Sequence, residues 1–181
     1  LTGSAENETG IRRLLKSIRH DSPTYEETIN RNGHKFDQKA TFIQVFKTNF
    51  IPHLGKQSMV RVWSGNLKEG QNLQDGIRVQ GLFSIKGKEL LKTSEAKAGD
   101  IVGLSRIESI KTGDLISDEK KEMSKDSNQP IPPQPIYVKA IRTVKREEDV
   151  KLSESLREIL ETDSSYIIER NSVTQQLLLW G

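Results

Sequence analysis

The spacing of hydrophobic residues changes along the chain and divides it into segments of different predicted structure. Near the N-terminus four residues follow the i, i+3, i+4, i+7 pattern of one helix face: Ile11, Leu14, Leu15 and Ile18. Asn7 and Thr9 are the candidate N-caps of this helix, and Pro23 is expected to end it. The polar segment 24–39 is predicted to be a connector with a turn at Asn32-Gly33.

From residue 40 onward the period changes to two, which is typical of β-strands. Within 40–47, the side chains of Phe42 to Lys47 are expected to point alternately to the two faces of a strand. Both faces carry apolar groups, as expected for strands of a small closed barrel. The same holds for 59–63. Further strands are predicted at 77–85, 89–93, 101–107 and 114–116, separated by glycine-containing turns. These segments predict an antiparallel β-barrel of roughly six to eight strands.

A change of composition follows the barrel. Segment 117–128 carries one apolar side chain, Met123, among charges and precedes a proline-rich stretch at 130–135. Such a segment cannot bury apolar surface, so we predict a linker with some stiffness and a domain boundary.

Beyond the linker the predicted order is strand, helix, strand, strand. The helix, at 150–162, has Asp149 as candidate N-cap, and the last two strands meet at Asn171-Ser172. The strands are expected at 136–141, 166–170 and 175–180. This order is the first half of a ferredoxin-like split βαβ unit. We therefore expect a mostly β chain with an α+β part, cut inside that unit.

Composition limits the possible functions. No apolar run approaches the roughly 18 residues of a membrane helix, and the N-terminus lacks a signal-peptide pattern, so a cytoplasmic location and no membrane partner are expected. The chain has no cysteine, and its three histidines lack metal-ligand spacing, so no metal site is predicted. A net charge of +3 permits an anionic partner, while 6% aromatic residues favour phosphate contacts over base stacking.

The sequence predicts no catalytic residues. Gly65 and Gly70 have the spacing of a phosphate-binding loop, but Gln71 and Asn72 follow and strands flank the segment, which favours a hairpin turn. Carboxylates such as those at 147–149 lie beside lysines in polar runs and are predicted to be solvated.

Basic residues are frequent on the predicted barrel, many at turns: Arg61, Lys68, Arg78, Lys86, Lys88, Lys92, Lys97, Arg106 and Lys111. One hypothesis is that they collect into a face that contacts phosphates. Ordinary solubilising charge is the alternative.

The barrel motifs resemble those of elongation factor G and its elongation-factor-G-like paralogues. Phe46-Lys47 and Gly55-Lys56-Gln57 precede Arg61–Gly70, which matches R-V-x-S-G-x-L-x-x-G. Ala98–Val102 and Thr112–Asp114 match the A-G-D-I-V and T-G-D motifs of the same family.

Both flanks of the barrel agree with this resemblance. Gly3-Ser4-Ala5 looks like the fifth guanine-nucleotide motif, which implies that Ser4 and Ala5 help to hold the guanine base in the intact protein. Segment 152–163 resembles the L-x-x-A-L-x-x-L-x-x-x-D helix of the third domain. The charged insert before Pro130 looks more like the paralogues than the translocase.

The resemblance implies a division into a GTPase-domain remnant and connector at 1–39, a barrel domain II at 40–117, a linker at 118–135 and half of a domain III at 136–181. It implies that the barrel packs on the GTPase domain and contacts small-subunit ribosomal RNA. The candidate phosphate contacts are Lys68, Lys86, Lys88 and Lys92.

GTP and magnesium are implied for the full-length protein and no cofactor for this chain, because the phosphate loop, the switch segments and the Asn-Lys-x-Asp motif do not occur in it. The chain is expected to be monomeric and inactive as an enzyme by itself. A class-3 peptide-release factor or a tetracycline-type ribosomal protection protein is the alternative within the family. A stand-alone RNA- or protein-binding barrel is the alternative outside it.

Overall fold

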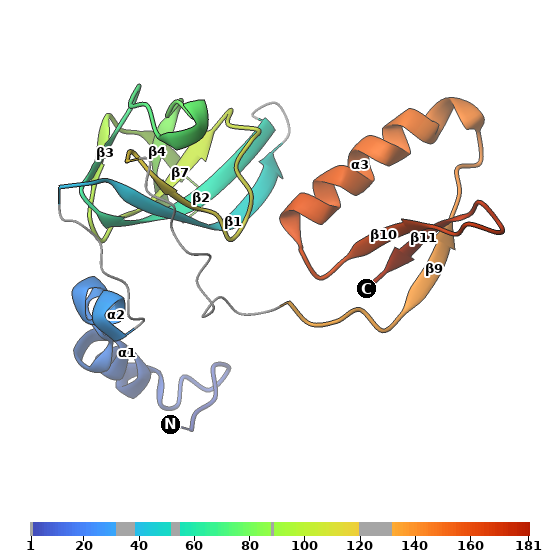
Figure 1. Cartoon of the computed structure of the whole chain (residues 1–181). Coiled ribbons are helices and arrows are strands. Elements are labelled where there is room, and N and C mark those ends of the chain that lie inside the picture. Colours follow the sequence, from blue (N-terminus) through green and yellow to red (C-terminus); the bar gives the residue numbers. More distant parts are fainter. Residues whose placement is uncertain (1, 32–38, 52–54, 88, 120–131) are drawn as a thin grey trace. The chain divides into compact units, whose positions relative to one another are not determined.

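The structure, a computed structural model, describes residues 2–31, 39–51, 55–87, 89–119 and 132–181. The chain divides into two units, Leu1–Lys35 and Phe36–Gly181 (Figure 1). The predicted turn at Asn32-Gly33 and most of the predicted linker at 118–135 lie outside the described residues. No described helix is long and apolar enough to cross a membrane.

The first unit begins with helix α1 (Ile11–Asp21), which confirms the helix predicted from the apolar spacing. Its predicted caps are wrong. The N-cap is Gly10, at a φ of 81°, and no side chain hydrogen-bonds to the first turn, so neither Asn7 nor Thr9 caps the helix. The apolar face remains largely exposed: 59% of Leu15 is accessible.

A second helix, α2 (Tyr25–Arg31), lies in the segment predicted to be a connector. Its start is a reciprocal capping box. Glu27 N donates to Thr24 Oγ1 at 3.2 Å, and Thr24 N donates to Glu27 Oε2 at 2.9 Å. Thr-x-x-Glu is the sequence pattern of this motif, so the sequence did contain a signal for the helix.

The second unit contains the predicted barrel strands. Among the described residues they are β1 (Phe42–Ile51), β2 (Gly55–Ser64), β3 (Asn66–Lys68), β4 (Leu82–Lys86), β5 (Glu89–Lys92), β6 (Glu95–Lys97), β7 (Ile101–Ser105) and β8 (Leu115–Ser117). One sheet has the order β5-β4-β7-β2-β1-β8, and β3 pairs with β6. All of these pairs are antiparallel, as predicted for the barrel.

Two strand predictions need correction. The strand expected at 77–85 begins only at Leu82, because the preceding residues form a local loop in which Val79 N donates to Gln71 O at 2.9 Å. A 3-10 turn within that loop has Asp75 at a φ of 56°. Strand β6 was not predicted. Its three residues include one apolar side chain, Ala96, which is buried.

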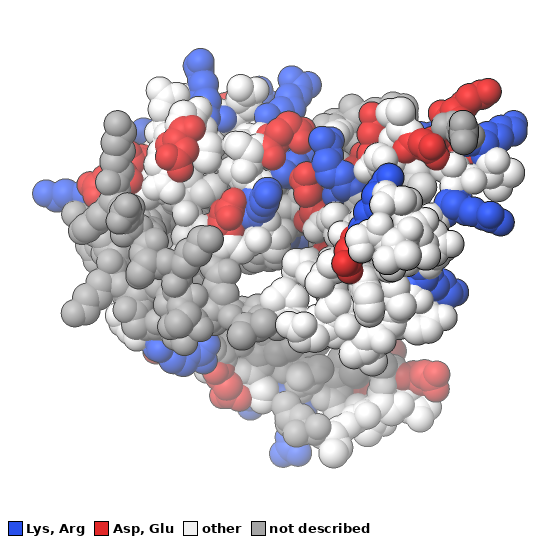
Figure 2. Space-filling model, turned by 45° about the vertical axis from the view of Figure 1, so that its right-hand side comes forward, with Lys and Arg blue, Asp and Glu red and all other residues white. Residues whose placement is uncertain are grey.

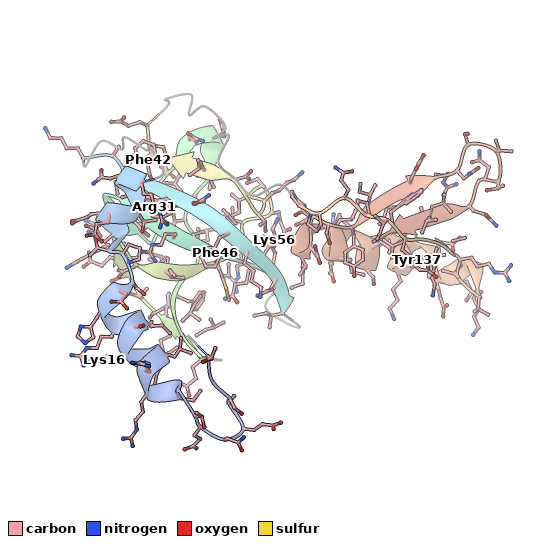
Figure 3. The ribbon with its side chains drawn as sticks, turned by 90° about the horizontal axis from the view of Figure 1, so that it is seen from below. Lys16, Arg31, Phe42, Phe46, Lys56 and Tyr137 are labelled. Carbon is pink, nitrogen blue, oxygen red and sulfur yellow. The ribbon has the colours of Figure 1, made fainter. Side chains whose placement is uncertain are left out.

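A β-bulge interrupts the simple alternation predicted for the first strand. The register of β1 against β2 shifts between Val45 and Lys47. Phe46 is 44% exposed, although Phe42 on the same predicted face is buried. Figure 3 labels both residues. The extra residue bends the strand and lets Thr48 turn inward, where it is fully buried.

One hydrophobic core holds the barrel strands together. Its members are Ile43, Val45, Val60, Val62, Leu67, Leu73, Val79, Leu82, Ala96, Val102, Leu104, Ile107, Ile110 and Ile116. Full burial of an aliphatic side chain of this size contributes about 1.5–3 kcal/mol. The core is therefore the main source of stability in this part of the chain.

The C-terminal segment contains β9 (Val138–Ile141), α3 (Asp149–Thr162), β10 (Ile167–Arg170) and β11 (Leu177–Trp180). The strands pair antiparallel in the order β10-β11-β9. This is the predicted strand–helix–strand–strand arrangement, and with the barrel it confirms the predicted fold class.

The predicted cap of α3 is wrong. Glu148 is the N-cap residue and its side chain makes no capping hydrogen bond. Asp149 lies inside the first turn, where its Oδ1 accepts a hydrogen bond from Thr143 Oγ1. The carboxylate therefore ties the helix to the end of β9.

Candidate functional site

The predicted guanine-binding residues lie in a short closed loop before α1. Ser4 and Thr9 exchange two backbone hydrogen bonds, of 3.0 and 3.1 Å. Glu8 N donates to Ala5 O at 3.2 Å, and Asn7 N donates to Ser4 Oγ at 3.4 Å. The Ala5 amide is exposed and donates to no described residue. The same is true of the neighbouring Glu6 amide, so the loop presents two free N–H groups on a backbone that is fixed at both ends.

The second predicted site contains lysines on the barrel, and three of the barrel's lysines occupy copies of one turn. The copies are Lys68-Glu69-Gly70-Gln71, Lys97-Ala98-Gly99-Asp100 and Lys111-Thr112-Gly113-Asp114. In each, the fourth residue's N–H donates to the lysine carbonyl oxygen, at 3.1, 2.9 and 3.1 Å. Its side-chain oxygen accepts from the lysine N–H, at 2.9, 2.8 and 2.7 Å.

These turns explain the motifs that carry the family resemblance. Each has glycine at the third position with a positive φ, of 84°, 96° and 97°. The prediction that the Gly65 to Gly70 segment is a strand–turn structure rather than a phosphate loop is confirmed, since β2 and β3 flank Gly65. The repeated Lys-x-Gly-Asp/Gln pattern was an available sequence signal for these turns.

Gln71 has a second task that an aspartate at this position could not perform. While its Oε1 closes the turn, its Nε2 donates to Thr41 Oγ1 at 3.1 Å and to Asp118 Oδ2 at 3.2 Å. Thr41 N also donates to Asp118 Oδ1 at 2.9 Å. This cluster joins the residue before β1 to the residue after β8, so it closes the barrel domain at its entry and exit.

The remaining candidate lysines belong to the β4–β5 hairpin. Lys86 ends β4 opposite Glu89, and Lys92 Nζ lies 3.2 Å from Glu69 Oε1. The structure therefore brings Lys92 beside the turn that carries Lys68. Lys88 lies outside the described residues.

Acidic side chains lie near the candidate lysines, since Lys92 is paired with Glu69 and Lys86 lies opposite Glu89. Figure 2 shows basic and acidic side chains interspersed on the face that it draws. In the Lys92–Glu69 pair, 69% of the lysine side chain is exposed, so the ion pair contributes little to stability. Lys68 and Lys86 are both exposed.

An arginine–tryptophan pair on the outer side of β2 was not predicted. The Arg61 guanidinium carbon lies 5.4 Å from the Trp63 ring centroid, within cation–π range. Trp63 Nε1 donates to Gln44 Oε1 at 3.0 Å, which fixes the ring. Arg61 Nε is buried and has no hydrogen-bond partner among the described residues. The alternation Arg-Val-Trp was the available signal, because it places both side chains on one face.

Among the residues that the structure describes, two titratable groups have a shifted pKa. The pKa of Tyr25 is raised by its hydrogen bond to Glu26, and the pKa of Asp163 is lowered by hydrogen bonds from Ser165. No group of three or more histidines or carboxylates among the described residues has the geometry of a metal site.

Comparison with known proteins agrees with these observations. Residues 41–119 match the family described as elongation factor G domain 2. An elongation factor G-like protein of Synechocystis sp. is 36% identical over 99% of this chain, and elongation factor G of Fervidobacterium nodosum is 29% identical over 99%. The matches cover 26% and 28% of those proteins, so the chain spans about a quarter of their length.

A crystal structure of a protein from Thermus thermophilus is also similar, with a TM-score of 0.78 and 31% identity. The match covers 97% of this chain and 26% of the other. Fold and matches together define a translation-factor-type β-barrel with an attached α+β segment. Residues 41–119 match the elongation factor G domain 2 family, and the chain as a whole is similar to an elongation-factor-G-like segment, as its motifs predicted. The roles of Ser4, Ala5 and the candidate lysines stay predictions.

Proposed function

We propose that this chain is part of an elongation-factor-G-like translational GTPase that acts on ribosomes in the cytoplasm. The observation that carries the proposal is the domain 2 family match at 41–119, extended by 36% identity to an elongation factor G-like protein over 99% of the chain. The elongation factor G of Fervidobacterium nodosum is less similar to the chain, at 29% identity. This difference supports an origin in an elongation-factor-G-like paralogue rather than in the translocase. The GTP phosphates and the magnesium ion would be held by residues outside this chain.

The proposed task of the barrel is to couple the GTPase domain to small-subunit ribosomal RNA. Lys68 and Lys86 would contact phosphates, because both are exposed and the Lys68 backbone is held by the turn that Gln71 closes. Lys92 would contribute less, since its ammonium lies 3.2 Å from the Glu69 carboxylate. Lys88 remains a candidate on sequence alone.

The loop before α1 would support the guanine base. The free Ala5 amide is one group available for a hydrogen bond, and Ser4 fixes the loop by pairing with Thr9 and by accepting from Asn7 N. Backbone groups suit this task because their positions do not depend on a flexible side chain.

Salt-dependent binding to purified small ribosomal subunits tests the coupling role. Each phosphate contact that is lost should lower the slope of log K against log[salt] by about 0.7–0.9. We expect the pair Lys68→Gln/Lys86→Gln to reduce both affinity and slope. The matched pair Lys145→Gln/Lys151→Gln, on exposed lysines of the C-terminal segment, should leave both unchanged. Equal effects of the two pairs would contradict the proposed contacts.

The GTPase part of the proposal has a separate test. The purified chain is expected to show no GTP turnover, because phosphoryl transfer needs a phosphate clamp and magnesium to neutralise the reacting groups. Turnover that copurifies with the chain and survives further purification would contradict the assignment.

A further inference from the structure

Lys56, near the start of β2, has an almost completely buried side chain, of which 1% is exposed (Figure 3). Its ammonium donates a hydrogen bond to the Glu108 carbonyl oxygen at 2.9 Å and lies 2.7 Å from Glu161 Oε2. Lysines are almost never fully buried unless they are paired. These two oxygens therefore make burial of the charged ammonium possible.

The two partners come from different parts of the Phe36–Gly181 unit. Glu108 follows β7 in the barrel, where Arg106 N also donates to Lys56 O at 3.3 Å. Glu161 lies in the last turn of α3, a helix that contacts β1. The barrel thus supplies a neutral carbonyl group, and α3 supplies the counter-charge.

Glu161 is poorly placed for its own helix. A carboxylate near the C-terminus of a helix meets the negative end of the helix dipole, and the last turn of α3 contains no basic residue. Glu161 Oε2 accepts no aligned hydrogen bond from a described residue, so its contact with Lys56 is an ion pair rather than a directed hydrogen bond. The group that stabilises this carboxylate lies outside α3.

We propose that the Lys56–Glu161 pair is the docking contact that holds α3 against the barrel. Leu156 is the one buried residue of α3, and Leu152 and Leu160 are half-buried, so the helix leaves much of its surface in water. If α3 separates, the Lys56 ammonium must find water or another anion, because an unpaired buried charge is strongly unfavourable. The charge pair therefore favours the docked arrangement of α3, independently of any ribosomal function.

The chain has no cysteine, so two introduced cysteines can carry spin labels without a background signal. Ser94→Cys in the barrel and Ser155→Cys in α3 replace exposed residues. In the otherwise unaltered chain, we expect double electron–electron resonance to give one narrow distance. Glu161→Gln should remove that narrow distance and give a broad distribution. Glu158→Gln, an exposed carboxylate one turn away on the same helix, is the control and should leave it intact.

Circular dichroism on the same samples separates undocking from unfolding, since undocked protein keeps its helix and strand signals. Glu161→Gln could unfold the barrel by leaving the Lys56 ammonium buried without a counter-charge. In that case the double variant Lys56→Met/Glu161→Gln removes both charges. This double variant should fold, and its distance distribution should remain broad. A narrow, unaltered distance in folded Glu161→Gln or in the folded double variant would overturn the proposal. So would a broad distribution in the chain that retains both charges.

Discussion

The barrel and the C-terminal segment both consist of antiparallel strands, but they bury their apolar side chains to very different extents. In the barrel, residues such as Ile43 and Leu82 are fully inaccessible. Among the described residues after 131, Leu156 is the buried hydrophobic residue, while Val144 and Val173 are 98% and 88% exposed. Strand formation alone therefore does not indicate where the stability of this chain lies.

The difference comes from how many elements share a core. Glycine turns return the barrel strands around one interior, so inward residues meet partners from several strands. In the C-terminal segment, three strands share one helix, and α3 residues line a common pocket with residues of β9 and β11. Three strands need a covering face for stability. We expect the C-terminal segment to open more readily than the barrel.

The largest predicted effect compares two leucines. Leu104→Ala, at a residue that is 1% exposed in the barrel core, should cost about 3 kcal/mol of unfolding free energy through lost burial and the cavity it leaves. Leu178→Ala, at a half-buried position in β11, should cost about 1 kcal/mol, since part of that side chain already meets water. Urea unfolding measures both. Equal losses would remove the distinction between the two regions.

Two glycines sharpen the comparison within the barrel. A Cβ at Gly65 would lie 2.7 Å from the Ala40 carbonyl oxygen and 2.8 Å from Thr41 Cα, and the residue has a φ of 68°. Gly65→Ala should therefore cost about 2–3 kcal/mol, because backbone must move. Gly87 has a similar φ of 62° but open space around it, so Gly87→Ala should cost about 1 kcal/mol. Thermal unfolding of both variants would show whether close packing or the positive φ causes most of the loss of stability.

A third prediction concerns the cluster that closes the barrel. Gln71→Glu keeps an oxygen for the Lys68 amide but replaces the Nε2 donor with a second carboxylate beside Asp118. We expect a loss of about 1 kcal/mol, as for a hydrogen bond to a charged group that is partly exposed. Asp100→Asn keeps both hydrogen bonds of its turn and should cost less. If Asp100→Asn were the more damaging change, closure by Gln71 would be unimportant.

Much of this architecture was predictable because local patterns determine it. The alternation around Val60 and Val62 predicted a strand, and the glycines at 65 and 70 predicted turns. Strand β6 was missed because Ala96 alone gives no periodicity. Helix α2 was missed although Thr24 and Glu27 carried the capping-box signal.

The polar contacts of the candidate sites were less predictable, since they join residues far apart in the sequence. The motif that contains Lys56 does not indicate that this lysine is buried, because its burial depends on Glu161 in another element. Lys92 was predicted to contact phosphate, but it lies beside Glu69, the residue that follows β3. Residue type identifies a charge. Only the fold shows whether that charge is already paired.

The smallest predicted effect lies in the C-terminal segment, where local hydrogen bonds matter more because little surface is buried. Asp163 Oδ1 accepts from Ser165 Oγ at 2.7 Å and from Ser165 N at 2.9 Å, and these bonds lower the pKa of the carboxyl below its ordinary value. A lowered folded-state pKa adds stability above the unfolded-state pKa, and that stability is lost as pH falls through the folded-state pKa.

Ser165→Ala removes the stronger of the two bonds and should raise the Asp163 pKa toward its ordinary value. The resulting loss of stability should be small, because the carboxylate is exposed and solvent screens the interaction. Carbon-detected NMR titration of the Asp163 carboxyl measures the shift directly, and Ser164→Ala, at the adjacent exposed serine, is the control. An unchanged titration midpoint in Ser165→Ala would mean that the backbone N–H alone sets the pKa. The Ser165 side chain would then contribute nothing measurable to the turn between α3 and β10.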